Sequence, residues 1–191
     1  MRATHPLTPI MAVLLTGVLA AAAKAQQPPD MMPSITDEQM IASALSAAPP
    51  AATREATVMT IEAEGTTRML RTGTNEITCL PDNPDTPGPD PMCADRNAME
   101  WTGAWLENRA PPADKVGVIY MLAGNSDPSG TDPQATEPAP GSDWVVTGPL
   151  IIIIGASKMM EGYPNSSPPD TTMPYIMWAG TPFEHAVIPI K

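Results

Sequence analysis

The chain has 191 residues and a formal net charge of −11, with 21 acidic residues against 10 basic ones. Proline occupies 25 positions and methionine 14, whereas aromatic residues make up only 4%. A chain this acidic lacks the basic surface that nucleic acids and anionic membranes require, and its length suits one domain better than two. These numbers exclude classes of partner and indicate no particular chemistry.

Residues 1–25 have the pattern of a secretory signal peptide. Arg2 supplies the positive start, residues 10–23 form an apolar run, and Ala23-Lys24-Ala25 offers small residues at a cleavage position. The apolar run is too short to span a membrane as a helix. We therefore expect a mature chain that begins at Gln26, has no membrane span, and is periplasmic or secreted.

Cys79 and Cys93 are the two cysteines of the chain. In an oxidising compartment two cysteines most simply form one disulfide, which here closes a loop of about 15 residues. Five prolines stiffen this loop already in the unfolded chain. Zinc is a poor alternative, because two cysteines and one distant histidine fall short of four ligands.

Residues 26–53 form a proline- and alanine-rich segment with one predicted helix, over 34–47. Thr36 and Gln39 have the spacing of a capping box, and the apolar side chains that follow share one face. Pro49 ends this helix. The pattern leaves open whether the helix packs on the compact domain, which we expect over residues 54–191.

Short β-branched runs over 56–63, 66–72 and 75–80 are separated by turns that contain glycine. This spacing predicts an antiparallel meander of three strands. After Cys93, small and aromatic residues recur at spacings of three and four, which predicts a helix that ends near Asn108. The residues that carry this pattern are Ala94, Ala98, Trp101 and Trp105.

The second half of the chain alternates apolar runs with long polar connections. Residues 116–123 predict a central strand and residues 124–143 a long loop. Four consecutive isoleucines end the strand over 150–154, and we expect both of its faces to be covered. The remaining predictions are strands at 144–146, 175–178 and 186–190 and a short helix at 155–162. Together the elements predict a loop-rich α+β domain with a mainly antiparallel or mixed sheet, two or three short helices and one disulfide.

Three groups of short strings occur together over about residues 55–190. They are Gly73-Thr74-Asn75 with Thr78-Cys79-Leu80-Pro81-Asp82 and Pro91-Met92-Cys93, Tyr120-Met121-Leu122 with Thr131-Asp132-Pro133, and Trp178-Ala179-Gly180-Thr181-Pro182-Phe183-Glu184-His185 with Val187-Ile188-Pro189. In these strings the chain resembles a family of exported bacterial proteins of uncharacterised function. The resemblance implies export and paired cysteines, and it assigns no catalytic residue.

Two residues are candidates for catalysis. His185 is the only histidine after residue 25, so a histidine acid or base would have to be this residue. Ser157 stands in half of a G-x-S-x-G pattern, in which Met159 replaces the second glycine. The structural alternatives are a helix cap for Ser157 and, for His185, burial on one face with Phe183 and Val187 and hydrogen bonds to backbone or turn groups.

Two sets of side chains are candidates for metal binding. Carboxylates of the proline-rich loop offer oxygen ligands to Ca²⁺, although their spacing departs from an EF-hand and Asp-Pro pairs are common in turns; they are Asp82, Asp85, Asp90 and Asp95. Methionine pairs offer thioethers to copper(I); they are Met31-Met32, Met159-Met160 and Met173 with Met177. Methionines inside strand-like runs are expected to fill the core instead; they are Met59, Met69, Met121 and Met177.

The sequence favours a small acidic exported protein that binds a ligand or a protein partner, or serves the cell envelope, without catalysis and without a cofactor. The alternatives are a small hydrolase-like enzyme that uses His185 and a periplasmic protein that binds calcium or copper. The surroundings of His185 distinguish these hypotheses. An enzyme places it in a cleft beside a hydroxyl or a carboxylate, whereas a binding protein leaves it packed and has its pocket elsewhere.

Overall fold

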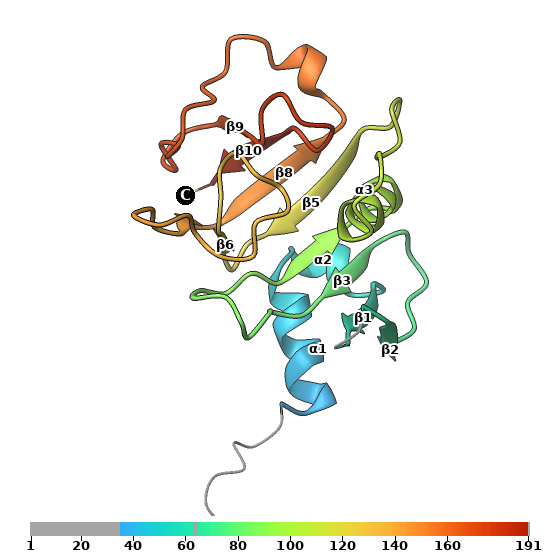
Figure 1. Ribbon diagram of the computed structural model, residues 1–191. Coiled ribbons are helices and arrows are strands. Elements are labelled where there is room, and N and C mark those ends of the chain that lie inside the picture. Colours follow the sequence, from blue (N-terminus) through green and yellow to red (C-terminus); the bar gives the residue numbers. More distant parts are fainter. Residues whose placement is uncertain (1–34, 63–64, 191) are drawn as a thin grey trace, which may run out of the picture. The chain divides into compact units, whose positions relative to one another are not determined.

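The computed structural model describes residues 35–62 and 65–190, and the predicted signal peptide lies outside them. The described part is an α+β domain built on a mixed eight-stranded sheet, as predicted (Figure 1). The helices are α1 (Asp37–Ser46), α2 (Pro50–Thr53) and α3 (Arg96–Leu106), with a single 3-10 turn, η1 (Ser157–Met159), where a short helix was predicted. None of the described helices is long and apolar enough to cross a membrane.

The large sheet has one parallel pair among antiparallel ones. In spatial order its strands are β2 (Thr67–Arg71), β1 (Thr57–Ile61), β3 (Thr78–Leu80), β4 (Met92–Ala94), β5 (Gly117–Met121), β8 (Leu150–Ile154), β10 (His185–Pro189) and β9 (Tyr175–Met177). A small second sheet pairs β6 (Asn125–Asp127) with β7 (Val145–Thr147). The predicted loop over 124–143 therefore begins with a strand.

The predicted three-stranded meander is wrong, because β2 and β3 lie on opposite sides of β1 and β3 runs parallel to it. The connection between β2 and β3 passes across the beginning of β1. The backbone nitrogens of Thr74 and Asn75 donate to the carbonyl oxygen of Glu55, at 2.8 and 3.2 Å. A Cβ at Gly73 would lie 2.2 Å from the nitrogen of Thr57, so only glycine fits this crossing.

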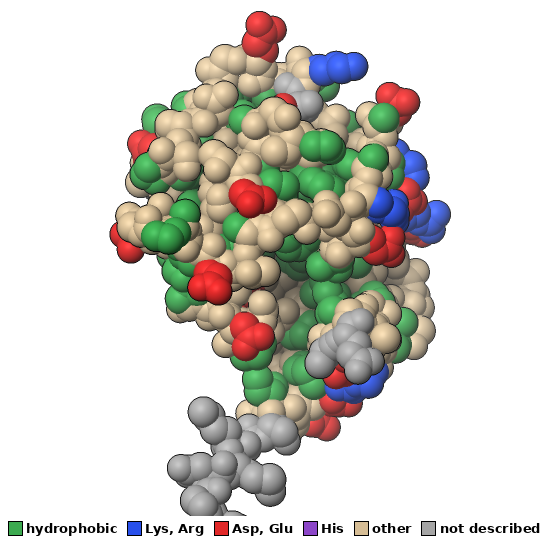
Figure 2. All heavy atoms as spheres, viewed as in Figure 1, with side chains coloured by type: hydrophobic (Ala, Val, Ile, Leu, Met, Phe, Trp, Pro, Cys, Tyr) green, Lys and Arg blue, Asp and Glu red, His purple; other side chains and the backbone are tan. Residues whose placement is uncertain are grey.

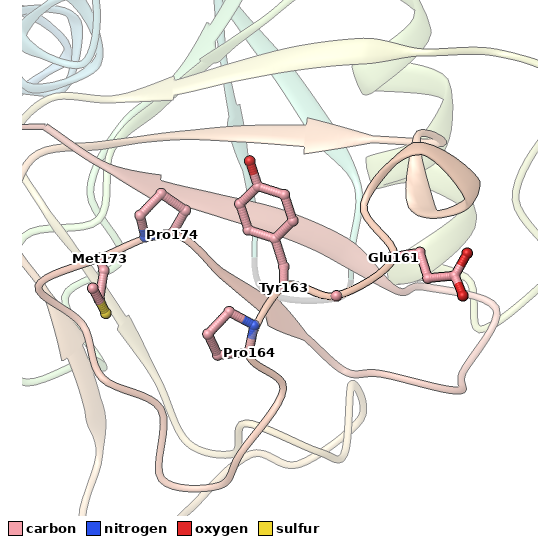
Figure 3. Close-up of a pocket in the computed structure, with 6 residues that line it drawn as sticks. Glu161, Tyr163, Pro164, Met173 and Pro174 are labelled. Carbon is pink, nitrogen blue, oxygen red and sulfur yellow. The ribbon is translucent and has the colours of Figure 1, made fainter.

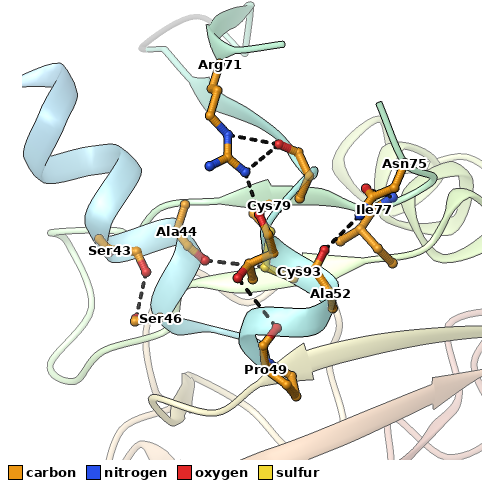
Figure 4. The surroundings of a disulfide bond; sticks show 12 residues. Ser43, Ala44, Ser46, Pro49, Ala52, Arg71, Asn75, Ile77, Cys79 and Cys93 are labelled. Carbon is orange, nitrogen blue, oxygen red and sulfur yellow. Dashed lines mark hydrogen bonds between the residues drawn. A yellow bond between two sulfur atoms is a disulfide. The ribbon is translucent and has the colours of Figure 1, made fainter. Parts of the chain in front are cut away.

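Helix α1 packs on the sheet and belongs to the same compact unit. It begins with the predicted capping box, in which Thr36 and Gln39 each accept a hydrogen bond from the other's backbone nitrogen. Ala44 of the helix, with Ala47 and Ala48 just after it, forms a core cluster with the first strands and with both cysteines. Figure 4 shows the disulfide beneath α1, with the carbonyl oxygen of Ala44 directed at Cys93.

The predicted disulfide between Cys79 and Cys93 is confirmed. The two residues face each other across β3 and β4, with their Cα atoms 4.0 Å apart and an S–S bond of 2.04 Å. The bond therefore ties together the two ends of the proline-rich loop, over residues 81–91, where they enter the sheet.

Helix α3 begins later than predicted, because Ala94 belongs to β4 and Asp95 caps the helix. The Asp95 carboxylate accepts from the nitrogen of Ala98 at 2.8 Å and from that of Val118 in β5 at 2.9 Å. This side chain thus starts the helix and fixes it to the sheet. Trp101 lies on the buried side of α3, as the spacing predicted.

The main core lies on the face of the sheet that α3 covers, and it includes aromatic residues from β9 to β10. Leu150, Ile152 and Ile154 are buried in it. Ile151 and Ile153 point to the other face and are only half-buried. Both faces of this strand are therefore covered, but unequally, because helices α1 and α2 lie over the first strands of the sheet.

Candidate functional site

His185 is buried, with 3% of its surface exposed, at the beginning of β10. Its Nδ1 lies 2.9 Å from the carbonyl oxygen of Phe183, and because a carbonyl oxygen only accepts, Nδ1 carries the proton. The rings of Trp101 and Trp178 stand edge to face against the imidazole, with centroid distances of 5.5 and 4.8 Å. Burial lowers the pKa of His185 to about 4, because the charged form would lose its hydration. At neutral pH the ring is an uncharged member of the aromatic core.

Trp178 connects this aromatic cluster to the long segment between β6 and β7. Its ring stacks on Trp101 and Trp105, with centroids 6.3 and 5.7 Å away. Its Nε1 donates to the carbonyl oxygen of Ser129 at 2.8 Å, and Trp105 donates in the same way to Pro133 at 2.6 Å. Trp178 also has a φ of 52°, a left-handed conformation that is uncommon outside glycine. Two indoles thus fasten the loop over the cluster.

The enzyme hypothesis needs a hydroxyl or a carboxylate beside His185. Within the described part of the chain, His185 forms no hydrogen bond with either group, and its hydrogen-bond partner is the carbonyl oxygen of Phe183. Glu184 accepts a hydrogen bond from the nitrogen of Gly180 at 2.6 Å. Ser157 begins η1, and its side chain lies outside the described part of the structure. The described residues therefore assemble no catalytic constellation around the histidine.

The carboxylates considered as calcium ligands bond to nearby protein groups. Asp82 accepts from the nitrogen of Asp90 at 2.7 Å, and Asp90 accepts from the nitrogen of Asn83 at 2.9 Å and from the Thr86 hydroxyl at 2.8 Å. Asp85 is exposed, and Asp95 lies apart as the cap of α3. In residues 35–62 and 65–190, no three His, Cys, Asp or Glu side chains come together as a set that could hold a metal ion.

Methionines of the described region are divided between core and surface. Met121 and Met177 are buried, as predicted, but Met69 is 54% exposed on the edge strand β2. Met173 is exposed while Met177 is buried in the main core, so this pair does not converge on a copper ion. Met31-Met32 lies outside the described residues.

Asp127, at the end of β6, is a titratable residue outside the candidate sets drawn from the sequence. Burial and, to a smaller extent, the charge of Asp90 raise the pKa of Asp127 to about 7, although a hydrogen bond from the amide of Asn125 acts in the opposite direction. Burial also raises the pKa of Asp90. The sequence signal was an Asp-Pro pair at 127–128, which predicts a turn and gives no sign that the carboxylate is buried.

Two surface hollows are lined in part by Tyr163, in the segment that follows η1. One hollow, of about 380 Å³, is lined by Glu161, Gly162, Tyr163, Pro164, Met173 and Pro174. The second, of about 420 Å³, shares the first three of these residues and extends to Lys158, Met160, Asn165, Ile176, Ala179 and Glu184. Figure 3 shows the rings of Tyr163, Pro164 and Pro174 close together, with Glu161 pointing away from them.

This segment is held to the outer edge of the sheet. The nitrogen of Ile176 in β9 donates to the carbonyl oxygen of Pro164 at 2.7 Å, so the segment covers part of an edge that would otherwise be open. Met159, Tyr163 and Met173 are among the large apolar side chains that remain exposed. Exposed apolar groups beside a hollow are typical of binding surfaces.

The structure therefore separates the two features that an enzyme would combine. The histidine lies in the core, and the hollows lie beside Tyr163, which sequence reasoning did not single out because a lone Tyr-Pro pair carries no periodic pattern. Comparison of the chain with protein-family models, with curated proteins and with solved structures finds no match in any of the three.

Proposed function

We propose that this chain is an exported, non-catalytic binding protein whose binding surface is formed by the two hollows beside Tyr163. The observation that carries the proposal is the concentration of exposed apolar side chains around adjoining concave surfaces in one segment that is anchored to β9. Ligand sites are concave, mostly apolar and furnished with a few polar groups.

Export is part of this proposal and is supported by two features. The sequence begins with a signal-peptide pattern, and the two cysteines are joined in a disulfide, which is typical of proteins in oxidising compartments. The periplasm or the extracellular medium is therefore the compartment in which we expect the partner.

The chemistry of the hollows favours an extended segment of a partner protein that carries apolar residues next to a basic one. Tyr163, Pro164, Met173 and Pro174 offer rigid rings and a flexible thioether to apolar side chains. Two carboxylates, of Glu161 and Glu184, and one ammonium group line the second hollow. Figure 2 shows acidic side chains spread over the visible face, as the net charge of −11 requires. A basic segment is the complementary partner.

The absence of catalysis is supported by the state of His185. With a pKa lowered to about 4, and with tryptophan rings against its own, the imidazole is neutral and enclosed at physiological pH. A general acid or base works best with a pKa near the operating pH and within reach of substrate.

Selection from a random 12-residue peptide library on the immobilised mature protein tests the proposal. Enriched peptides are expected to contain apolar residues beside Lys or Arg. When they are titrated by calorimetry, Tyr163→Ala should weaken binding by about tenfold or more. Leu106→Ala, at an exposed position on α3, is the matched control and should bind like wild type. No enrichment, or equal binding to the Tyr163 variant, would contradict the proposal.

A further inference from the structure

The loop closed by the disulfide runs beside β6 and touches it without room for added side chains. A Cβ at Gly88 would lie 2.8 Å from the hydroxyl oxygen of Ser126. A Cβ at Gly124 would lie 3.3 Å from the carbonyl oxygen of Pro89, and Gly124 has a φ of 122° that favours glycine. Residues 88–89 and 124–126 are therefore in close contact.

Two acidic residues adjoin this contact, because Asp90 follows Pro89 in the loop and Asp127 follows Ser126 in β6. Asp127 belongs to β6, and the negative charge of Asp90, in the loop, contributes to raising the pKa of Asp127. Asp90 is in turn faced by Asp82, whose carboxylate holds the backbone nitrogen of Asp90. None of the ion pairs found in the described part of the chain includes any of these three residues. The contact therefore concentrates negative charge without a compensating cation.

The other elements around Asp127 supply uncharged groups. Asn125 donates its amide to the carboxylate. Burial is the main reason why the pKa of the Tyr175 phenol, in β9, is raised to about 12, and the charge of Asp127 adds to it. The hydroxyl of Tyr175 is hydrogen-bonded to that of Thr147 in β7 at 2.9 Å. Neutral donors stabilise one ionised carboxylate only in part when it is buried beside a second one.

Ser126 gives an independent sign that the contact is not fully satisfied. It is 4% exposed, and its hydroxyl, which faces Gly88 of the loop, has no hydrogen-bond partner in the described part of the structure. A buried polar group without a partner lowers the stability of the closed contact.

We propose that the contact between residues 88–90 and β6 is a pH-sensitive clasp, closed while Asp127 holds a proton and loosened when Asp90 and Asp127 are both ionised. The disulfide keeps the ends of the loop in the sheet, so loosening is confined to the loop and to β6. In an exported protein such a clasp would respond to the pH outside the cytoplasm.

The pKa of about 7 for Asp127 supports this mechanism, because it places the change within the neutral range. The opened loop exposes Asp127 to water, where its pKa returns to the ordinary value of 3.8. Linkage between these two values predicts that the population of the closed form, relative to the open form, falls about tenfold between pH 6 and 8.

Hydrogen exchange of the mature, disulfide-bonded protein tests the clasp. Protection factors for the amides of Gly88, Asp90 and residues 125–127, corrected for the chemical exchange rate at each pH, should fall about tenfold between pH 6 and 8. Asp127→Asn should remove this dependence. Asp85→Asn, at an exposed position of the same loop, should retain it.

Protection that stays constant between pH 6 and 8 in the wild type, or that falls equally in Asp127→Asn, would overturn the proposal. If that variant does not fold, NMR titration of the Asp127 carboxyl carbon in the wild type decides the question. A midpoint near 7 supports the clasp, and a midpoint below 5 overturns it.

Discussion

The aromatic cluster around His185 and the acidic contact around Asp127 enclose titratable side chains of opposite kinds, His185 fully and Asp127 partly. Trp101 and Trp178 enclose an imidazole that is neutral in the fold, with a pKa of about 4. At the acidic contact, a second carboxylate helps to hold the pKa of Asp127 at about 7. Burial disfavours charge in both places, and because one group is a base and the other an acid, the pKa values move in opposite directions.

The two regions therefore give the free energy of unfolding opposite dependences on pH. The contribution of His185 is fully present above its unfolded pKa of 6.5 and is lost as pH falls toward the folded value of about 4. The contribution of Asp127 is fully present below 3.8 and is lost as pH rises toward about 7. Between about pH 4 and 6.5 the two slopes oppose each other.

The largest expected effect is the loss of the aromatic cluster in Trp101→Ala. Trp101 contacts the rings of Trp178, Phe183 and His185, and truncation leaves a cavity among them. We expect the free energy of unfolding to fall by about 3–5 kcal/mol, measured by urea denaturation. Leu106→Ala, on the same helix but 51% exposed, should change it by about 0.5 kcal/mol or less. Equal losses in both variants would contradict the core role of the cluster.

The next largest effect concerns the opposite pH dependences that His185 and Asp127 give to the free energy of unfolding. His185→Asn keeps an amide that can donate to the carbonyl oxygen of Phe183. In the wild type, His185 should lower the free energy of unfolding by about 3 kcal/mol as the pH falls from 6.5 to 4, and this loss should be absent in the variant. Asp127→Asn should remove the opposite slope, of similar size. The measurement is the free energy of unfolding from pH 4 to 8 in the wild type, both variants and the double variant. Parallel curves in all four proteins would show that neither group titrates as inferred.

A smaller effect is expected when the disulfide is removed. Replacing Cys79 and Cys93 together by alanine releases a loop whose closure is worth about 3 kcal/mol on the chain-entropy argument, and the prolines of the loop reduce this value. We therefore expect a loss of about 2 kcal/mol in urea denaturation. The contribution of Asp127 to the pH dependence should shrink as well, because the loop is no longer held against β6, whereas the contribution of His185 should remain. A change in the His185 slope would show that the two regions are coupled.

Local sequence patterns were sufficient where the physical cause is local. The capping box of Thr36 and Gln39 and the helical spacing that includes Trp101 are confirmed. Local sequence patterns failed where the path of the chain depends on contacts between distant residues. The parallel pairing of β3 with β1 requires residues 72–77 to pass across the beginning of β1. The sign of this crossing in the sequence is the glycine at position 73, where the two backbones approach closely.

The candidate sites show the same division. Alternation along the chain placed His185 with Phe183 and Val187 in the core, and the structure confirms its burial and its backbone partner. The hollows beside Tyr163 combine a loop with residues of β9 and of the turn before β10, which no short pattern brings together.

By itself the sequence determined the α+β class, the disulfide and the buried histidine, because composition, cysteine number and alternation act through short-range geometry. Only the tertiary structure decided that the loop of Asp90 touches the strand of Asp127 and that Tyr163 lines two hollows. Both arrangements join segments that are far apart along the chain. Their charges and side chains interact through space, so neither the raised pKa of Asp127 nor the concave surface exists until the sheet and its loops are assembled.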